Sequence, residues 1–360
     1  MQNFYLFFCF IPSCFIPNCF FSNEFPVLSQ SEIQSGIDDV PDEVIKHTVG
    51  FLDQKSWVAF LQVNQRFNAL IPKWVKVIQV KGRSAAEIKT KLTALLFKDG
   101  SEGQVHIALE ALDLSRSNIT AESLRNLLDF IQEHFPNIKS LNLRGNMIGK
   151  AGVAHLAGLI QLEELFLTGN DIGAAGVFYL KGLTRLEALD LRGNRLGDLG
   201  AAYLGGLTQL KFLDLGGNNL GDSGVAQLVG LTQLKSLTLT WNNLGDAGAA
   251  HLEKLTQLET LDLDKNNLGD LGAAHLAQLT QLKSLYLTGS NLGDLGAAHL
   301  SRLSQLEVLD LKGNSLGPVG IADLERLTQL KFLDLNGTNI DAESFYALRK
   351  ALGSSVVIYY

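Results

Sequence analysis

The chain has 360 residues, of which 46% are hydrophobic and 19% charged, so it is long enough for an extended repeat array together with a second small domain. A formal net charge of −7 at pH 7 argues against nucleic acid as a partner, because phosphate binding needs a basic surface that this sequence does not supply. All three cysteines lie among the first nineteen residues, which excludes a disulfide framework for the rest of the chain and suits a reducing cytosol.

Residues 4–21 form an uncharged, Phe-rich apolar run that Pro12 and Pro17 interrupt. The run approaches the length of a membrane span, but a secretory signal needs a basic start, and no Lys or Arg precedes Lys46. Two prolines would also kink a helix. We interpret residues 1–37 as a leader that is either disordered or an export or anchor segment, and membrane association through it stays open.

The sequence of residues 38–80 predicts a small module of three short helices. Pro41 suits the start of the first helix, Asp53 can cap the second, and the third runs over about residues 64–70. A segment of about forty residues cannot bury a self-sufficient core. We therefore expect this module to need a partner surface.

This module resembles an F-box, whose pattern is Leu-Pro-x-Glu with two hydrophobic residues, then Phe-Leu-Asp, then Val-Cys-Arg with an aromatic residue. The matching residues are Pro41, Glu43, Val44, Ile45, Phe51, Leu52, Asp53, Val63, Arg66 and Phe67. Val40 replaces the usual Leu, and Asn64 and Gln65 replace the Cys-basic pair. In that family the module docks on the Skp adaptor of a cullin-RING ubiquitin ligase, and the repeats that follow select the substrate. The resemblance implies adaptor contact through Pro41, Glu43, Val44, Ile45, Phe51, Leu52, Val63 and Phe67.

After a connecting helix and N-terminal cap expected at residues 81–108, residues 109–340 repeat one pattern, with a spacing of 24 residues from Ile138 on. The copy from Leu186, L-E-A-L-D-L-R-G-N-R-L, matches L-x-x-L-x-L-x-x-N-x-L, the pattern of leucine-rich repeats. The fold class is therefore α/β, a leucine-rich-repeat solenoid with parallel strands on the concave face and short helices on the convex face. Residues 341–360 depart from the pattern and are expected to form the C-terminal cap.

Each repeat position has a physical role. The alternation along residues 189–192 points Leu189 inward and Asp190 outward, as in a strand. Asn194 should turn inward and bond to buried backbone groups, and its loss should cost about 1–3 kcal/mol. Asp198 is placed to cap the helix that follows, and small residues at 200–202 let the helix and strand layers approach closely.

The repeats themselves, with Gly-Ala-Ala-His-Leu-Ala at Gly272–Ala277, resemble the GALA-type repeats of bacterial F-box effectors, which are delivered into eukaryotic cells. Similar repeats occur in ribonuclease-inhibitor-like proteins that have no F-box.

Because the repeats are so regular, a residue that recurs at one position is background, and a residue that departs from the consensus is a candidate for binding. Charges alternate in sign just before successive strands, and an outward aspartate recurs in most strands, so we treat both as defaults of the repeat. Histidines recur at one helix position, too far apart to share a metal ion: His155, His251, His275 and His299. The informative departures put Trp241 and Lys265 where glycine is the rule, and Tyr286 where aspartate is the rule.

The predicted target-binding residues on the concave face are therefore Trp241, Asp262, Asp264, Lys265 and Tyr286, with a weaker second patch of Phe166, Arg192 and Phe212. No catalytic, metal-binding or cofactor motif of usable spacing is present, so we expect neither an enzyme nor a cofactor. The leading hypothesis is a cytosolic substrate receptor of a ubiquitin ligase, either resident in its own cell or delivered into a host cell. Its rival is a plain binding or inhibitor scaffold, either free or tethered to a membrane through residues 4–21.

Overall fold

The computed structural model describes residues 77–79, 84–96 and 109–360, an alternation of short strands and short helices. The strands are β1 (Val77–Gln79), β2 (Ala111–Asp113), β3 (Ser140–Asn142), β4 (Glu164–Phe166), β5 (Ala188–Asp190), β6 (Phe212–Asp214), β7 (Ser236–Thr238), β8 (Thr260–Asp262), β9 (Ser284–Tyr286), β10 (Val308–Asp310), β11 (Phe332–Asp334) and β12 (Val357–Tyr359). The α-helices are α5 (Ala85–Leu96), α6 (Ala121–His134), α7 (Gly149–Leu156), α8 (Gly173–Val177), α9 (Gly197–Ala202), α10 (Asp222–Val225), α11 (Asp246–Leu252), α12 (Gly269–Leu276), α13 (Asp294–Leu300), α14 (Pro318–Asp323) and α15 (Ala342–Leu352). Short 3-10 helices are η2 (Phe178–Gly182), η3 (Ala226–Leu228) and η4 (Leu324–Arg326).

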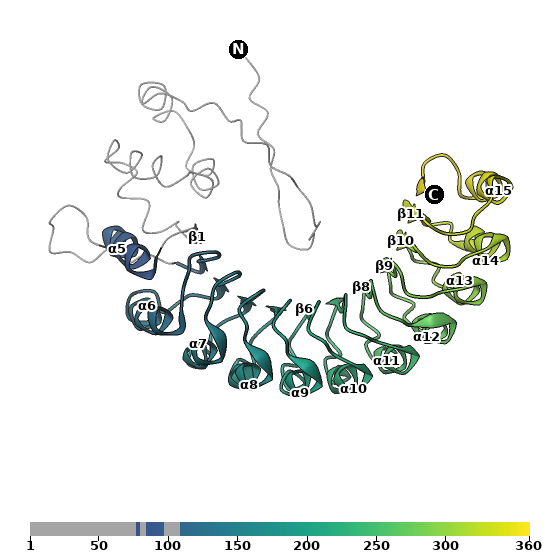
Figure 1. Cartoon of the computed structure of the whole chain (residues 1–360). Coiled ribbons are helices and arrows are strands. Elements are labelled where there is room, and N and C mark those ends of the chain that lie inside the picture. Colours follow the sequence, from purple (N-terminus) through teal and green to yellow (C-terminus); the bar gives the residue numbers. More distant parts are fainter. Residues whose placement is uncertain (1–76, 80–83, 97–108) are drawn as a thin grey trace, which may run out of the picture. The chain divides into compact units, whose positions relative to one another are not determined.

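Within the described residues, the twelve strands form one parallel sheet in chain order from β1 to β12. Leu165 pairs with Leu189, and Leu189 with Leu213, so the register advances by one repeat at each strand. Figure 1 shows the strands along the inner side of a curved array and the helices along its outer side. Neighbouring strands lie about 4.8 Å apart whereas packed helices need about 8–10 Å, so stacked repeats bend toward the strands. The predicted α/β solenoid is confirmed.

Leucines at fixed positions fill the space between strands and helices. In one regular repeat Leu189 and Leu191 are both 0% exposed. A Cβ added to Gly200 would lie 2.7 Å from Cβ of Leu196 and 3.4 Å from Cα of Ala174 in the preceding helix. The close approach of α8 and α9 therefore depends on a glycine at position 200, as the run of small residues predicts.

A ladder of buried asparagines links the repeats. The Nδ2 group of Asn194 donates to the carbonyl oxygens of Leu191 and Leu167, each at 2.9 Å, and Oδ1 accepts from the backbone N–H of Asn170 at 2.9 Å. Equivalent bonds to the backbone are made by Asn146, Asn218, Asn242, Asn266 and Asn314. This confirms the role predicted for the repeated asparagine. At Ser290, where the asparagine is missing, the hydroxyl is buried and has no hydrogen-bond partner among the described residues.

The aspartates that open the helical half of the repeats do not cap their own helices, which corrects the sequence-based expectation. Asp198 lies inside the first turn of α9, whose N-cap residue is Leu196. Its Oδ1 accepts instead from the backbone N–H of Gly221, the N-cap residue of α10, at 2.7 Å. Asp222, Asp270 and Asp294 make the same contact with the glycine of the next repeat, at 2.7–2.8 Å. Stacking brings the unpaired N–H of one helix start within reach of the preceding repeat, so these aspartates connect repeats.

The charges just before the strands pair as their alternating signs predict. Exposed pairs join Lys139 to Glu163 at 2.9 Å, Lys211 to Glu187 at 2.7 Å, Lys283 to Glu259 at 2.7 Å and Lys331 to Glu307 at 2.5 Å. Each is worth about 0–1 kcal/mol in water. The ladder is part of the scaffold and implies no ligand.

The two ends of the array differ from the regular repeats. At the C-terminal end, the side chain of Asp341 caps α15, and β12 pairs with β11. At the other end β1 pairs with β2, so residues 77–79 belong to the sheet and not to the helical module assigned to residues 38–80. The apolar leader and the remainder of the F-box-like module lie outside the described residues.

Candidate functional site

The last residues of strands β3 to β11 form one row across the inner face of the sheet, which we call the central row. Its members are Asn142, Phe166, Asp190, Asp214, Thr238, Asp262, Tyr286, Asp310 and Asp334. Residues at alternate strand positions share a face, so these side chains point away from the leucine core. Two positions further along each repeat, a second row includes Arg144, Arg192 and Asp264.

Arginines neutralise the aspartates in the N-terminal half of the central row. Arg144 donates from Nε and Nη2 to Oδ2 of Asp190 at 2.9 and 2.5 Å, and its guanidinium lies 4.6 Å from the ring centroid of Phe166. Arg192 donates from Nη2 to Oδ2 of Asp214 at 2.6 Å. Both aspartates point away from the leucine core, as predicted for Asp190, but each is only 4% exposed. Burial raises the pKa of Asp214 despite these bonds.

The second patch predicted from the sequence therefore lies in a part of the face that satisfies its own charges. Phe166 lies under Arg144, and Arg192 is bonded to Asp214. Phe212, the first residue of β6, is half-buried. These three residues lie on consecutive repeats, but the Arg192 guanidinium is already bonded within the chain.

The C-terminal half of the central row is different. Among the described residues, no ion pair within 4.0 Å involves Asp262, Asp310 or Asp334 of this row, or Asp264 of the second row. Their carboxylates accept hydrogen bonds from backbone N–H groups at 2.7–3.0 Å. Tyr286 stands between Asp262 and Asp310 in the register of the sheet.

Burial and mutual repulsion perturb this group of acids. Burial, together with the charges of Asp262 and Asp310, raises the pKa of Asp264 to about 6, although the N–H of Thr288 donates to it at 2.7 Å. Burial also raises the pKa of Asp310 and that of Tyr286. Asp310 and Asp334 were not among the predicted binding residues, because the recurring aspartate was interpreted as background. The signal that could have found them lies in the second row, which carries Arg144 and Arg192 in the N-terminal half but Asp264 in the C-terminal half.

Trp241 and Lys265 occupy a position with left-handed backbone geometry. Glycine fills this position in seven other repeats, with φ between 60° and 72°: Gly145, Gly169, Gly193, Gly217, Gly289, Gly313 and Gly337. Trp241 and Lys265 both have φ 57° there. Trp241 is 65% exposed, so it does not fold down over its own loop, and Lys265 extends over Gly289.

The structure brings the five principal target-binding candidates together on three adjacent repeats. Asp262 and Tyr286 are register partners on β8 and β9, and the N–H of Trp241 donates to the carbonyl oxygen of Asp264 at 2.9 Å. Lys265 follows Asp264 directly and its N–H donates to Thr288 at 2.8 Å. The result is an exposed indole and a phenol ring beside unpaired carboxylates.

Several other predicted features lie elsewhere. All the predicted adaptor-binding residues, Pro41 to Phe67, are outside the described residues. On the helix side, Nδ1 of His275 lies 2.5 Å from Oε1 of Glu253. Among the described residues, no group of three or more His, Cys, Asp or Glu side chains could hold a metal ion. In the same part of the chain, no helix combines the length and apolar character that a membrane crossing requires.

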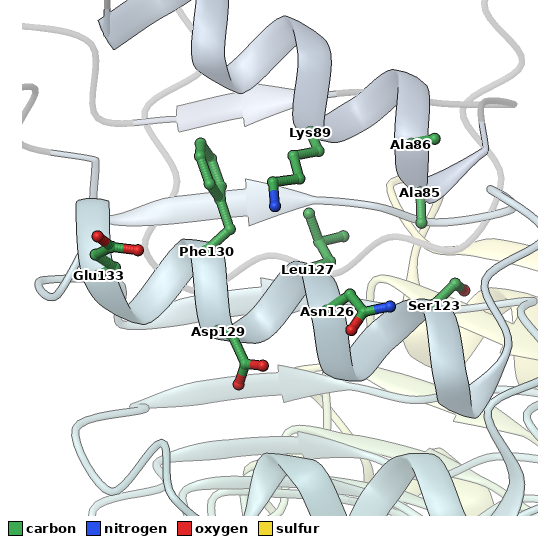
Figure 2. Close-up of a pocket in the computed structure, with 9 residues that line it drawn as sticks. All are labelled: Ala85, Ala86, Lys89, Ser123, Asn126, Leu127, Asp129, Phe130 and Glu133. Atoms are coloured by element: carbon green, nitrogen blue, oxygen red, sulfur yellow. The ribbon is translucent and has the colours of Figure 1, made fainter.

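A pocket of about 530 Å³ lies between α5 and α6 (Figure 2). Its lining combines Ala85 and Ala86 with the Lys89 side chain, whose Nζ lies 5.3 Å from the ring centroid of Phe130. Figure 2 shows these side chains on facing helices. None of the predicted target-binding residues lines this pocket.

Parallel strands joined by an asparagine ladder, with helices outside, define a repeat solenoid whose inner face is available for binding. A leucine rich repeat family model matches residues 160–220, 184–244, 232–292 and 280–340, and a second leucine rich repeat model matches residues 135–157. The chain belongs to the leucine-rich-repeat family.

Solved structures of similar fold include two internalins and a plant receptor. An internalin from Listeria monocytogenes is 24% identical, covers 84% of this chain and 92% of its own, and superposes with a TM-score of 0.50. Internalin C2 of the same organism is 26% identical, covers 58% and 82%, and has a TM-score of 0.45. The ectodomain of the Arabidopsis receptor kinase HAESA, in complex with a peptide hormone, is 27% identical, covers 57% and 35%, and has a TM-score of 0.46. No curated protein matches the chain.

Proposed function

We propose that this chain is a non-enzymatic binding protein that holds a protein target on the inner face of its repeats. The contact is centred on Trp241 and Tyr286, with Asp262, Asp264 and Lys265 around them. The observation that carries this proposal is the exposure of Trp241, 65%, at a position where the other repeats favour glycine.

Left-handed geometry costs a residue other than glycine about 1–2 kcal/mol. Trp241 recovers little of this cost by burial, because most of its surface faces solvent. Aromatic side chains flanked by charge dominate the energetics of protein interfaces. A target that covers the indole and the ring of Tyr286 would account for both residues.

The test compares capture of partner proteins by the full chain and by two variants. Trp241→Gly with Tyr286→Ala restores the repeat glycine at 241 and should abolish capture while the solenoid remains folded. Leu271→Ala is the matched control, because Leu271 is a similarly exposed apolar side chain, 66%, on helix α12 of the outer side. Capture that survives the double variant, or that is lost equally in the control, would place the contact elsewhere.

We also propose, more specifically, that the chain acts as a substrate receptor of a ubiquitin ligase, in the manner of a bacterial effector in a host cell. The support is the sequence of the F-box-like module, in which Pro41, Glu43 and Ile45 match the family pattern directly ahead of a repeat array. Purified Skp adaptor should bind the full chain, and Pro41→Ala with Ile45→Ala should abolish that binding. Adaptor binding that is absent or indifferent to this variant would contradict the proposal.

The rival is a binding or inhibitor scaffold without a ubiquitin role, either free or tethered to a membrane. The support for tethering is the apolar run at residues 4–21. If a tagged chain enters the membrane fraction, and deletion of residues 1–28 returns it to the soluble fraction, the tethered scaffold is favoured. Both proposals share the inner face as the target-binding surface.

A further inference from the structure

We propose that the target presents an arginine-bearing extended segment to the C-terminal half of the inner face. One arginine stacks on Tyr286 and bonds to Asp310, and neighbouring basic side chains pair with Asp262, Asp264 and Asp334. This inference rests on the proposed function, since it names the chemistry of the partner that the same face would hold.

An internal contact of the chain supplies the template. Arg144 stacks on Phe166, one strand further along the sheet, and bonds to Asp190, two strands further along. The same steps of 22 and 46 residues lead from position 264 to Tyr286 and Asp310. The aromatic ring and the carboxylate are thus repeated, and only the arginine is replaced, by Asp264.

This replacement reverses the charge of the site. Arg144 and Arg192 offset Asp190 and Asp214 in the N-terminal half. In the C-terminal half four aspartates face two lysines, Lys265 and Lys312, and no ion pair among the described residues involves either lysine. A face that carries unpaired carboxylates beside aromatic rings is complementary to guanidinium groups, which bond to carboxylates and stack on rings.

The spacing of the carboxylates selects an extended segment over a single ion. From Asp262 on β8 to Asp334 on β11 the sheet advances by three strands, a distance of about 14 Å. Such a spread is unsuited to one metal ion, and the described residues contain no group that could hold one. Alternate side chains of an extended peptide are about 7 Å apart. Basic residues at alternate positions over five residues therefore cover the same distance.

The probes are short fluorescent peptides with arginine at three alternate positions, and matched peptides with citrulline, lysine or glutamate there. We expect the arginine peptide to bind the full chain and the citrulline peptide, which has the same shape without the charge, to bind about tenfold to hundredfold more weakly. The lysine peptide should be intermediate, because lysine bonds to carboxylates but lacks the planar stacking group. The glutamate peptide should not bind.

The decisive variant is Asp264→Arg, which restores the arginine of the template. Its guanidinium should occupy Tyr286 and Asp310 from within the chain and reduce binding of the arginine peptide by about tenfold or more. Asp246→Arg makes the same charge change at the exposed start of α11, on the outer side, and should leave binding within about twofold. Denaturation curves of both variants confirm that each is folded.

Equal binding of the arginine and citrulline peptides would overturn the proposal. Equal losses of affinity for the arginine peptide in Asp264→Arg and Asp246→Arg would also overturn it, because they would indicate attraction by net charge alone. The outcome is separable from the proposed function. If Trp241→Gly with Tyr286→Ala abolishes target capture but arginine peptides do not bind, the inner face binds a partner of another chemistry. If neither experiment shows an effect, both proposals fail.

Discussion

Replacing Asp264 by asparagine should stabilise the protein at neutral pH. Asp264 is surrounded by the carboxylates of Asp262 and Asp310 and by the ring of Tyr286, and its pKa is raised to about 6, mainly by burial. Asparagine keeps an oxygen to accept the bond from the N–H of Thr288, which Asp264 accepts at 2.7 Å. The substitution therefore removes a charge without leaving a donor unpaired.

The size of the effect follows from the pKa. A rise from 3.8 to about 6 corresponds to about 3 kcal/mol if solvent did not screen the group. Asp264 is only half-buried, so about 1–2 kcal/mol is a realistic gain for Asp264→Asn. Because the folded state holds this proton more tightly than the unfolded state, the contribution of Asp264 to stability falls as pH rises from about 4 to about 6.

Guanidinium denaturation of the parent chain and Asp264→Asn at about pH 4 and about pH 7 measures this difference. The variant should be more stable near pH 7, and the gap should nearly vanish near pH 4, where Asp264 is protonated. Asp190→Asn, in the neighbouring central row, is the matched control. It should lose about 1–3 kcal/mol, because Asp190 accepts two bonds from Arg144. A difference in unfolding free energy between the two chains that does not depend on pH would refute the electrostatic reasoning. So would an Asp264→Asn variant that is less stable than the parent chain.

Four further outcomes are expected from the same physical arguments. Asn218→Ala should lower the free energy of unfolding by about 3 kcal/mol, because it leaves buried carbonyls of two repeats unpaired, and thermal denaturation checks this. Ser290→Asn should raise it by about 1–3 kcal/mol by restoring the ladder where a buried hydroxyl now lacks a partner, and an unchanged midpoint would count against that role. Trp241→Gly should raise it by about 1 kcal/mol by relieving left-handed strain while target capture is lost. Binding of a basic partner should weaken below about pH 6, and more steeply in the parent chain than in Asp264→Asn, as a titration of peptide affinity against pH would show.

Much of the fold was predictable because a repeat specifies its own surroundings. Each 24-residue step places Leu189, Leu213 and their equivalents beside copies of themselves, so one copy predicts the core of all the others. The buried asparagine was predictable for the same reason, since an amide turned inward must bond to backbone groups. The aspartate at the helix start was misassigned because its partner, Gly221 for Asp198, belongs to the next repeat.

The candidate site was predictable only in part. Departures from the consensus at Trp241, Lys265 and Tyr286 were visible in the sequence, since nine comparable repeats supplied the background. The left-handed geometry and the exposure of Trp241 required the structure. The pairing of the aspartates also required it, because Arg144 reaches Asp190 across 46 residues of sequence.

The period and the leucine spacing were enough to predict a leucine-rich-repeat solenoid, because they leave one way to bury the apolar side chains. The consensus was also enough to identify the residues that depart from it. Which aspartates of the central row are neutralised became visible only in three dimensions, because a long arginine side chain selects its partner by reach and by stacking across strands. The repeat pattern specifies neither.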